Sequence, residues 1–162
     1  MVNLPVIHLE SATTAIDAEK ALPFEFVRSH PCVSIGFFFD EKVYSGQPNA
    51  INFDTCWALI DTGADHIYVD KRLIEKYRCP VAVGGEKMNV NNQQGAKAYQ
   101  GSVFVKEEGR IINMWVIADD FVAKAMPFSV VLGRRFLQFC ELTWQGPQQK
   151  VSLSIGEHST AY

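Results

Sequence analysis

The sequence predicts a mostly β protein of one domain with one or two short helices. Short segments rich in Val, Ile and Phe alternate with turns that contain Gly, Pro and Asn, which is the pattern of strands joined by hairpin loops. The length of 162 residues fits one domain. Hydrophobic residues make up 48% of the chain and charged residues 20%, a composition that excludes a disordered chain and a coiled coil.

Most elements follow from local patterns. One short helix is predicted after Asp70, a suitable N-cap, because Leu73, Ile74 and Tyr77 fall on one side at helical spacing. Residues 134–139 are predicted to hold one or two further helical turns. A turn is predicted at 44–49. Strands are predicted over residues 24–28, 32–39, 51–60, 102–106, 110–118, 130–133, 141–144 and 150–155.

Residues 81–101 form a long polar segment with several glycines and asparagines. A structureless loop of that length is unusual in a compact domain, so we predict an extended hairpin with a mobile tip.

The two ends of the chain are predicted to lie outside the folded domain. Residues 1–22 are mixed and polar, and we interpret them as an N-terminal extension or a peripheral segment such as a short helix. The folded domain is predicted over residues 23–156, and residues 157–162 are predicted to be a C-terminal tail. The start of the chain lacks the basic and apolar regions of a secretory signal, so we expect a cytoplasmic protein.

Charge, hydropathy and cysteine spacing restrict the partners. A formal net charge of −3 offers no basic excess for phosphates, so we expect no nucleic-acid partner. The apolar stretches are shorter than the roughly 20 residues of a spanning helix, so we expect no membrane partner. The four cysteines lack the usual zinc-site spacing and are predicted to be small buried side chains. We expect no metal and no cofactor.

Two motifs carry the candidate chemistry. An apolar strand runs directly into residues 61–65, Asp-Thr-Gly-Ala-Asp, and a later apolar segment, 130–132, leads into Gly133 and Arg134. In this order, over residues 51–144, the motifs resemble the retropepsin family of single-domain aspartic proteases. In that family an apolar strand, Asp-Thr/Ser-Gly-Ala, a flap hairpin, an apolar-apolar-Gly-Arg segment and a helix follow one another.

The resemblance implies a closed, barrel-like retropepsin fold with Asp61 as the catalytic residue. Two carboxylates a few Å apart cannot both ionise and therefore share one proton. One can then act as general base toward water and the other as general acid. Because the chain has a single Asp-Thr-Gly and about half the length of a two-lobed pepsin-like enzyme, catalysis requires a homodimer in which Asp61 faces its symmetry mate.

The resemblance also implies supporting roles. Thr62 would hydrogen-bond across the two-fold axis, and Gly63 would let the backbone pass close to the carboxylates. Asp65 would pair with Arg134, which follows Gly133, and would so hold the active-site loop. Ala64 cannot donate a hydrogen bond to the carboxylate, so we expect a less acidic pH optimum than that of pepsin-like enzymes.

The resemblance also implies a flap, and the sequence departs from the family pattern at Arg135. The flap would span about residues 90–101 and close over substrate, with its substrate-binding tip at Asn92, Gln93, Gln94 and Gly95. Arg135 stands where the family usually has Asp or Asn, so the start of the following helix and nearby dimer contacts are expected to differ.

The sequence thus predicts an aspartic-type endopeptidase, a hydrolase that cleaves extended peptides as a homodimer. The alternative is a catalytically silent dimerisation or peptide-binding module on the same fold, which would accept a peptide by strand addition. Aspartyl-phosphate chemistry on Asp61 is disfavoured, since the chain lacks a second Asp two residues later and a Gly-rich phosphate loop.

Overall fold

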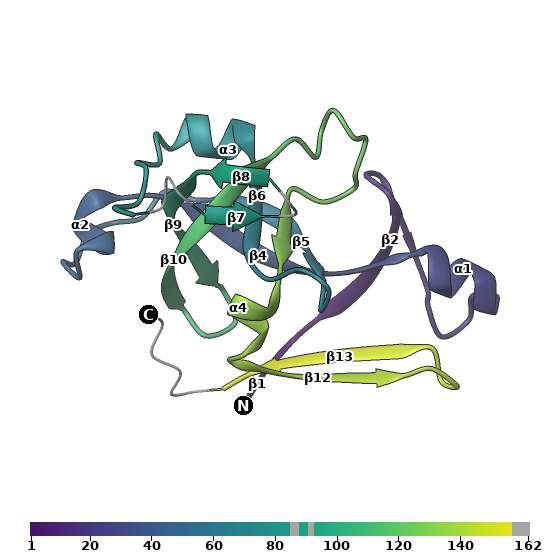
Figure 1. Cartoon of the computed structure of the whole chain (residues 1–162). Helices are drawn as coiled ribbons and strands as arrows, with labels where there is room; N and C mark the ends of the chain where they lie inside the picture. Colours follow the sequence, from purple (N-terminus) through teal and green to yellow (C-terminus); the bar gives the residue numbers. More distant parts are fainter. Residues whose placement is uncertain (85–87, 91–92, 157–162) are drawn as a thin grey trace.

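The structure, a computed structural model, describes residues 1–84, 88–90 and 93–156. The strands in these ranges form an eight-stranded, a three-stranded and a two-stranded sheet, so the mostly β prediction is confirmed (Figure 1). The strands are β1 (Val2–Leu4), β2 (Val6–Ser11), β3 (Thr14–Ile16), β4 (His30–Phe38), β5 (Asp54–Ile60), β6 (Ile67–Asp70), β7 (Met88–Val90), β8 (Gln93–Ala96), β9 (Ala98–Val105), β10 (Arg110–Asp119), β11 (Val130–Leu132), β12 (Cys140–Gln145) and β13 (Lys150–Ile155). The helices are α1 (Pro23–Arg28), α2 (Glu41–Tyr44), α3 (Lys71–Lys76) and α4 (Arg134–Leu137).

Six strands of the large sheet close into a barrel in the order β4-β5-β11-β6-β10-β9, and β9 pairs back onto β4. The closing register places Gly36 opposite Phe104. A Cβ on Gly36 would lie 2.8 Å from Phe53 Cδ2 and 3.0 Å from Phe104 Cβ, so the closure depends on the absence of a side chain there. The closed barrel expected from the sequence is confirmed.

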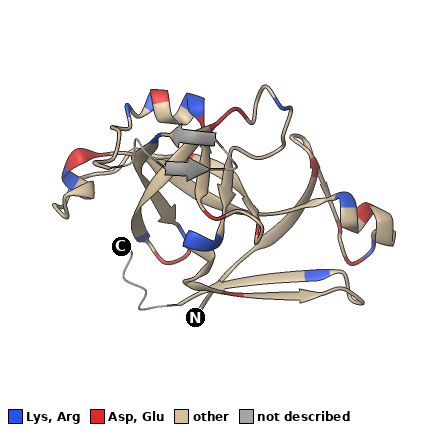
Figure 2. Ribbon diagram, viewed as in Figure 1, with Lys and Arg blue, Asp and Glu red and all other residues tan. Residues whose placement is uncertain are grey.

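The barrel interior is an apolar core, to which nearly every strand contributes. Ile35, Phe37, Ile67 and Val103 are fully buried in one cluster, and burial of each such side chain stabilises the fold by about 1.5–3 kcal/mol. Figure 2 shows most of the charged residues on the helices and connecting loops. The barrel strands therefore form the apolar core, and the helices and loops carry most of the charged groups.

The N-terminal residues belong to the sheets. β1 pairs with β13, and β2 pairs with β4 while β3 pairs with β2. The alternative of a short peripheral helix within residues 1–22 is therefore wrong. β1 and β2 are ordered by partners about 20 to 150 residues away, which local patterns do not reveal. A domain boundary at residue 22 stays a prediction.

The predicted strand at residues 24–28 is also wrong, because this segment forms α1. Pro23 occupies the first helical position, where its fixed φ favours a helix start. The Glu25 carboxylate accepts a hydrogen bond from the Leu22 N–H at 3.0 Å. Phe26 is 4% exposed whereas Phe24 and Val27 are 58% and 74% exposed, so the apolar run does not mark a buried strand.

The remaining helices are short. α3 is confirmed, with Asp70 as its N-cap and Leu73 and Ile74 buried. α2 ends where the turn at 44–49 was predicted to begin, and the Asp40 carboxylate caps it by accepting from the Val43 N–H. No helix in the described ranges is long and apolar enough to cross a membrane. Of the four free cysteines, three are buried as predicted and Cys140 is half-buried.

Two predicted hairpins are present. β7 and β8 pair antiparallel, with Met88 opposite Ala96, within the predicted extended hairpin. β12 and β13 pair around the predicted turn at Gly146. β13 also pairs with β1, which leaves β12 at one edge of the three-stranded sheet (Figure 1).

Asp54 links the start of β5 to the end of α3. Its Oδ1 accepts hydrogen bonds from Lys76 Nζ and from the Tyr77 hydroxyl, each at 2.6 Å. The Lys76 hydrogen bond, followed by that of Tyr77, lowers the pKa of Asp54. A carboxyl group whose pKa is lowered by folding stabilises the protein above its unfolded pKa of about 4, and this contribution is lost as the pH falls through the folded value.

We predict that Asp54→Asn lowers the free energy of unfolding by about 1 kcal/mol at pH 7. The cost should shrink as the pH falls from about 4 through the lowered pKa of the folded protein, because the wild-type carboxylate becomes protonated over that range. Urea denaturation at several pH values measures this difference. Asp17→Asn is the control, since the exposed Asp17 carboxylate forms a long ion pair with Lys20. A cost for Asp54→Asn that stays constant down to about pH 2 would contradict the prediction.

Candidate active site

The candidate site lies where β5 ends. β11 is inserted between β5 and β6: it pairs in parallel with β5 and antiparallel with β6. The 61–66 loop that joins β5 to β6 must therefore cross the end of β11. The Asp61 N–H donates to the Leu132 carbonyl at 3.2 Å, which anchors the first loop residue on β11.

The chain after β11 holds the far side of this loop. Three consecutive N–H groups donate to loop carbonyls: Gly133 to His66 at 3.1 Å, Arg134 to Ala64 at 2.8 Å and Arg135 to Asp65 at 3.1 Å. Backbone N–H groups at the start of α4 thus donate hydrogen bonds to the loop carbonyls. These bonds do not depend on the side chain at position 135.

Gly133 lies at the tightest point of this crossing. A Cβ on it would stand 2.1 Å from the His66 oxygen and 2.7 Å from the Ala64 oxygen. Its φ of −82° is ordinary, so the position requires glycine for lack of space and not for an unusual backbone angle. Only glycine lets the two chain segments approach closely enough for the three hydrogen bonds.

The Asp61 side chain is half-buried and bonded to its own loop. Its Oδ1 accepts a hydrogen bond from the Gly63 N–H at 2.8 Å. A Cβ on Gly63 would lie 3.2 Å from the same oxygen, which is tighter than most contacts of that kind. The loop therefore presents one backbone donor to the carboxylate at a position where a small residue is favoured.

Asp65 and Arg134 form the ion pair that the sequence predicts. The Arg134 guanidinium also reaches the Thr62 carbonyl, at 3.5 Å from Nη1. Both side chains of the pair are exposed, and such pairs contribute little to stability. The pair instead restrains the loop at Thr62 and Asp65, on either side of Gly63 and Ala64. Thr62 is itself exposed.

A cavity of about 330 Å³ adjoins Asp61. Its wall is mainly apolar and aromatic, and it is formed by Leu59, Asp61, Gly63, Ala64, Tyr68, Asp119, Phe121, Lys124, Met126, Phe128 and Val131. Asp61 thus lines a space that suits an apolar group of a ligand.

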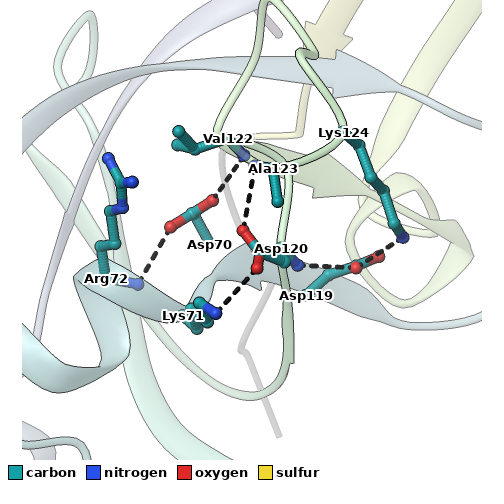
Figure 3. A network of polar contacts seen from close by, with 8 residues as sticks. All are labelled: Asp70, Lys71, Arg72, Asp119, Asp120, Val122, Ala123 and Lys124. Carbon is teal, nitrogen blue, oxygen red and sulfur yellow. Dashed lines mark hydrogen bonds and ion pairs between the residues drawn. The ribbon is translucent and has the colours of Figure 1, made fainter.

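Residues 119–131 build one wall of this cavity, and Asp70 holds their loop (Figure 3). Asp70 is 2% exposed. Its Oδ1 accepts from the Arg72 N–H at 2.9 Å and its Oδ2 from the Val122 N–H at 3.1 Å. Its own N–H donates to the Ser129 carbonyl at 2.9 Å. One buried carboxylate therefore joins the start of α3 to the loop beside Asp61.

Two ion pairs extend this network. Lys124 Nζ lies 2.7 Å from Asp119 Oδ1, and Lys71 Nζ lies 2.7 Å from Asp120 Oδ2 (Figure 3). The Lys71 hydrogen bond lowers the pKa of the Asp120 carboxyl. Asp119 lines the same cavity as Asp61, but its Oδ1 is already engaged by Lys124.

The predicted flap residues are placed only in part. Gln93, Gln94 and Gly95 lie in β8, while Asn92 lies outside the described residues. Ala96, the last residue of β8, packs against the apolar cluster that contains Tyr68, Phe121, Phe128 and Val131, all of which line the cavity. The base of the β7–β8 hairpin therefore lies beside the cavity.

The aromatic and charged residues of the cavity wall were not predicted from the sequence to be site residues. Tyr68, Phe121 and Phe128 come from two separate segments, and Lys124 is one of several surface lysines. The sequence has no motif that joins them. The apolar residues that follow β10 were the available signal, but they do not follow a regular period.

Comparisons with known proteins identify similar structures. No family profile and no curated protein sequence matches the chain. The EIAV protease complexed with the inhibitor HBY-793 matches at 17% identity with a TM-score of 0.40, over 67% of this chain and 86% of that chain. The retroviral protease-like domain of Ddi1 from Leishmania major matches at 17% identity with a TM-score of 0.45, over 78% and 90%. At these values no function follows from either likeness.

We predict that Gly133→Ala lowers the free energy of unfolding by about 3 kcal/mol, because the new methyl group forces the 61–66 loop and the start of α4 apart. Chemical denaturation measures the loss. Gly146→Ala is the matched control: the nearest atom to a Cβ there is 3.9 Å away, so its effect should stay within about 0.5 kcal/mol. Equal stability of the two variants would show that the crossing is not tight.

Proposed function

We propose that the chain is an aspartic endopeptidase of the retropepsin type, active as a homodimer. The observation that carries the proposal is the placement of Asp61. Four backbone hydrogen bonds join its loop to residues 132–135. Asp61 also lines a mainly apolar cavity. Catalytic groups need this kind of rigid support.

The chemistry requires two carboxylates that share a proton. The ionised Asp61 removes a proton from a water molecule as the water oxygen attacks the carbonyl carbon of the substrate. The protonated Asp61 of the second chain gives its proton to the carbonyl oxygen. Collapse of the tetrahedral intermediate breaks the C–N bond: the leaving nitrogen takes the proton that the first Asp61 removed from water, and the second Asp61 takes back a proton from a hydroxyl of the intermediate, which becomes the new carboxyl group. The two groups titrate as a pair, so the dyad has apparent pKa values that belong to neither residue alone.

The second carboxylate is proposed to come from another copy of the chain. Asp119 shares the cavity with Asp61, but its Oδ1 is engaged by Lys124, so it is a poor candidate for the second member. A two-fold axis near Thr62 and Gly63 would bring the two Asp61 side chains together. β12, at the edge of the three-stranded sheet, is available for strand pairing between the copies.

The proposed substrate is an extended peptide with apolar side chains near the bond that is cleaved. The apolar cavity of about 330 Å³ would take one such side chain. The β7–β8 hairpin, whose last residue Ala96 packs on the cavity wall, would act as the flap with Gln93, Gln94 and Gly95 near its tip. A cytoplasmic location, residues 23–156 as the catalytic domain and a less acidic optimum caused by Ala64 stay predictions of this proposal.

We predict that Asp61→Asn reduces peptide cleavage by at least about a hundredfold, because the amide cannot accept the proton of the water. Wild type and variant are incubated with a proteome-derived peptide library between about pH 4 and pH 7, and new termini are read by mass spectrometry. Asp17→Asn, an exposed change, is the control and should cleave as wild type does.

Two other results would redirect the proposal. Equal cleavage by wild type and Asp61→Asn would remove Asp61 from the mechanism. Peptide binding without cleavage by the wild-type dimer would instead favour a catalytically silent peptide-binding module on the same fold.

A further inference from the structure

A second and larger cavity lies beside the site described above. It measures about 910 Å³, within the usual size range of small-molecule sites. Its wall brings together the end of α2, the 65–66 part of the loop, β10 and α4. Asp61 is not among the described residues that line it.

The charge of this wall is positive. It contains Arg134 and Arg135 from α4 and one carboxylate, Asp65, and the blue first turn of α4 is visible in Figure 2. Arg134 is paired with Asp65. The side chain of Arg135 is exposed and has no acidic partner within the described ranges; only its backbone is used, through its N–H to Asp65 and its carbonyl to Gln138. One guanidinium is therefore left over to receive an anion.

The field of Arg135 reaches a second lining residue, His66. Burial, and then the nearby Arg135 charge, lower the pKa of His66. The imidazole therefore favours its neutral form, which can donate one hydrogen bond and accept another. The carboxylate on this side of the cavity, that of Asp65, is paired with Arg134, which offsets its repulsion of an anion at Arg135.

Two aromatic residues, Trp115 and Tyr44, also line the cavity. Trp115 is 37% exposed, so part of its indole faces the open cavity. Tyr44 lies at the end of α2, with its ring centroid 5.6 Å from that of Phe39. Burial raises the pKa of the Tyr44 hydroxyl, which keeps it as a neutral donor. The exposed part of the Trp115 indole is an apolar surface that needs little reordering to bind a flat group.

We propose that this cavity binds a small molecule that carries an oxyanion on a flat apolar body. Arg135 receives the anion, since a guanidinium matches a carboxylate or phosphate with two parallel hydrogen bonds. The indole of Trp115 packs on the body. Because Asp65 and His66 of the 61–66 loop line the cavity, a bound molecule would touch the loop that carries Asp61. The proposal holds whether or not the chain cleaves peptides.

The test is calorimetric titration of the full chain with benzoate and with phenyl phosphate, which distinguish the two sources of the oxyanion. Benzamide supplies the same ring without charge, and inorganic phosphate supplies the charge without a ring. We expect at least one of the two aromatic anions to bind saturably, at least tenfold more tightly than benzamide or inorganic phosphate.

Variants locate the binding. Arg135→Gln should weaken the binding at least tenfold, while Arg28→Gln, an exposed arginine on α1, should leave it unchanged. Thermal unfolding checks that both variants are folded. In NMR spectra the bound anion should shift the indole N–H signal of Trp115 and leave that of Trp144 in place. No saturable binding to wild type, equal binding of benzamide, or equal effects of the two arginine substitutions would overturn the proposal.

Discussion

The backbone hydrogen bonds between the 61–66 loop and residues 132–135 hold the rest of the site together. They form because β11 lies between β5 and β6, so the loop has to cross the chain that leaves β11. The crossing has no room for a side chain at Gly133. The loop is thus fixed to the end of β11 and to the start of α4, and Asp61 is fixed with it.

The same arrangement explains how one small chain carries two cavities. The loop separates the apolar cavity beside Asp61 from the cationic and aromatic cavity beside Arg135. Asp70 steadies the outer wall of the first, and the Asp65–Arg134 pair lies at the border of the second. The barrel positions the loops, and the loops carry the candidate functional residues, as is common in folds that serve several functions.

How far the sequence predicts this structure depends on whether the signal is local. The β12–β13 hairpin and α3 were predicted, because turn residues and an N-cap such as Asp70 act within a few positions. α1 was not, because Pro23 and Glu25 override an apolar run that resembles a strand. β1 and β2 were not, because they pair with β13 and β4, which are distant in sequence. The Asp65–Arg134 contact was implied by the resemblance of the two motifs to those of the retropepsin family, whereas the cavity wall formed by Phe121 and Phe128 depends on tertiary packing that no short pattern encodes.

The proposal that two copies of Asp61 form one site can be tested by the stoichiometry of inhibitor binding. A peptide that carries a tetrahedral hydroxyl-bearing carbon in place of the scissile carbonyl mimics the transition state and should bind more tightly than a substrate. Calorimetric titration of the wild-type chain should give one such inhibitor per two chains, and Asp61→Asn should lose that affinity. One inhibitor per chain, or equal affinity for wild type and Asp61→Asn, would contradict a shared site.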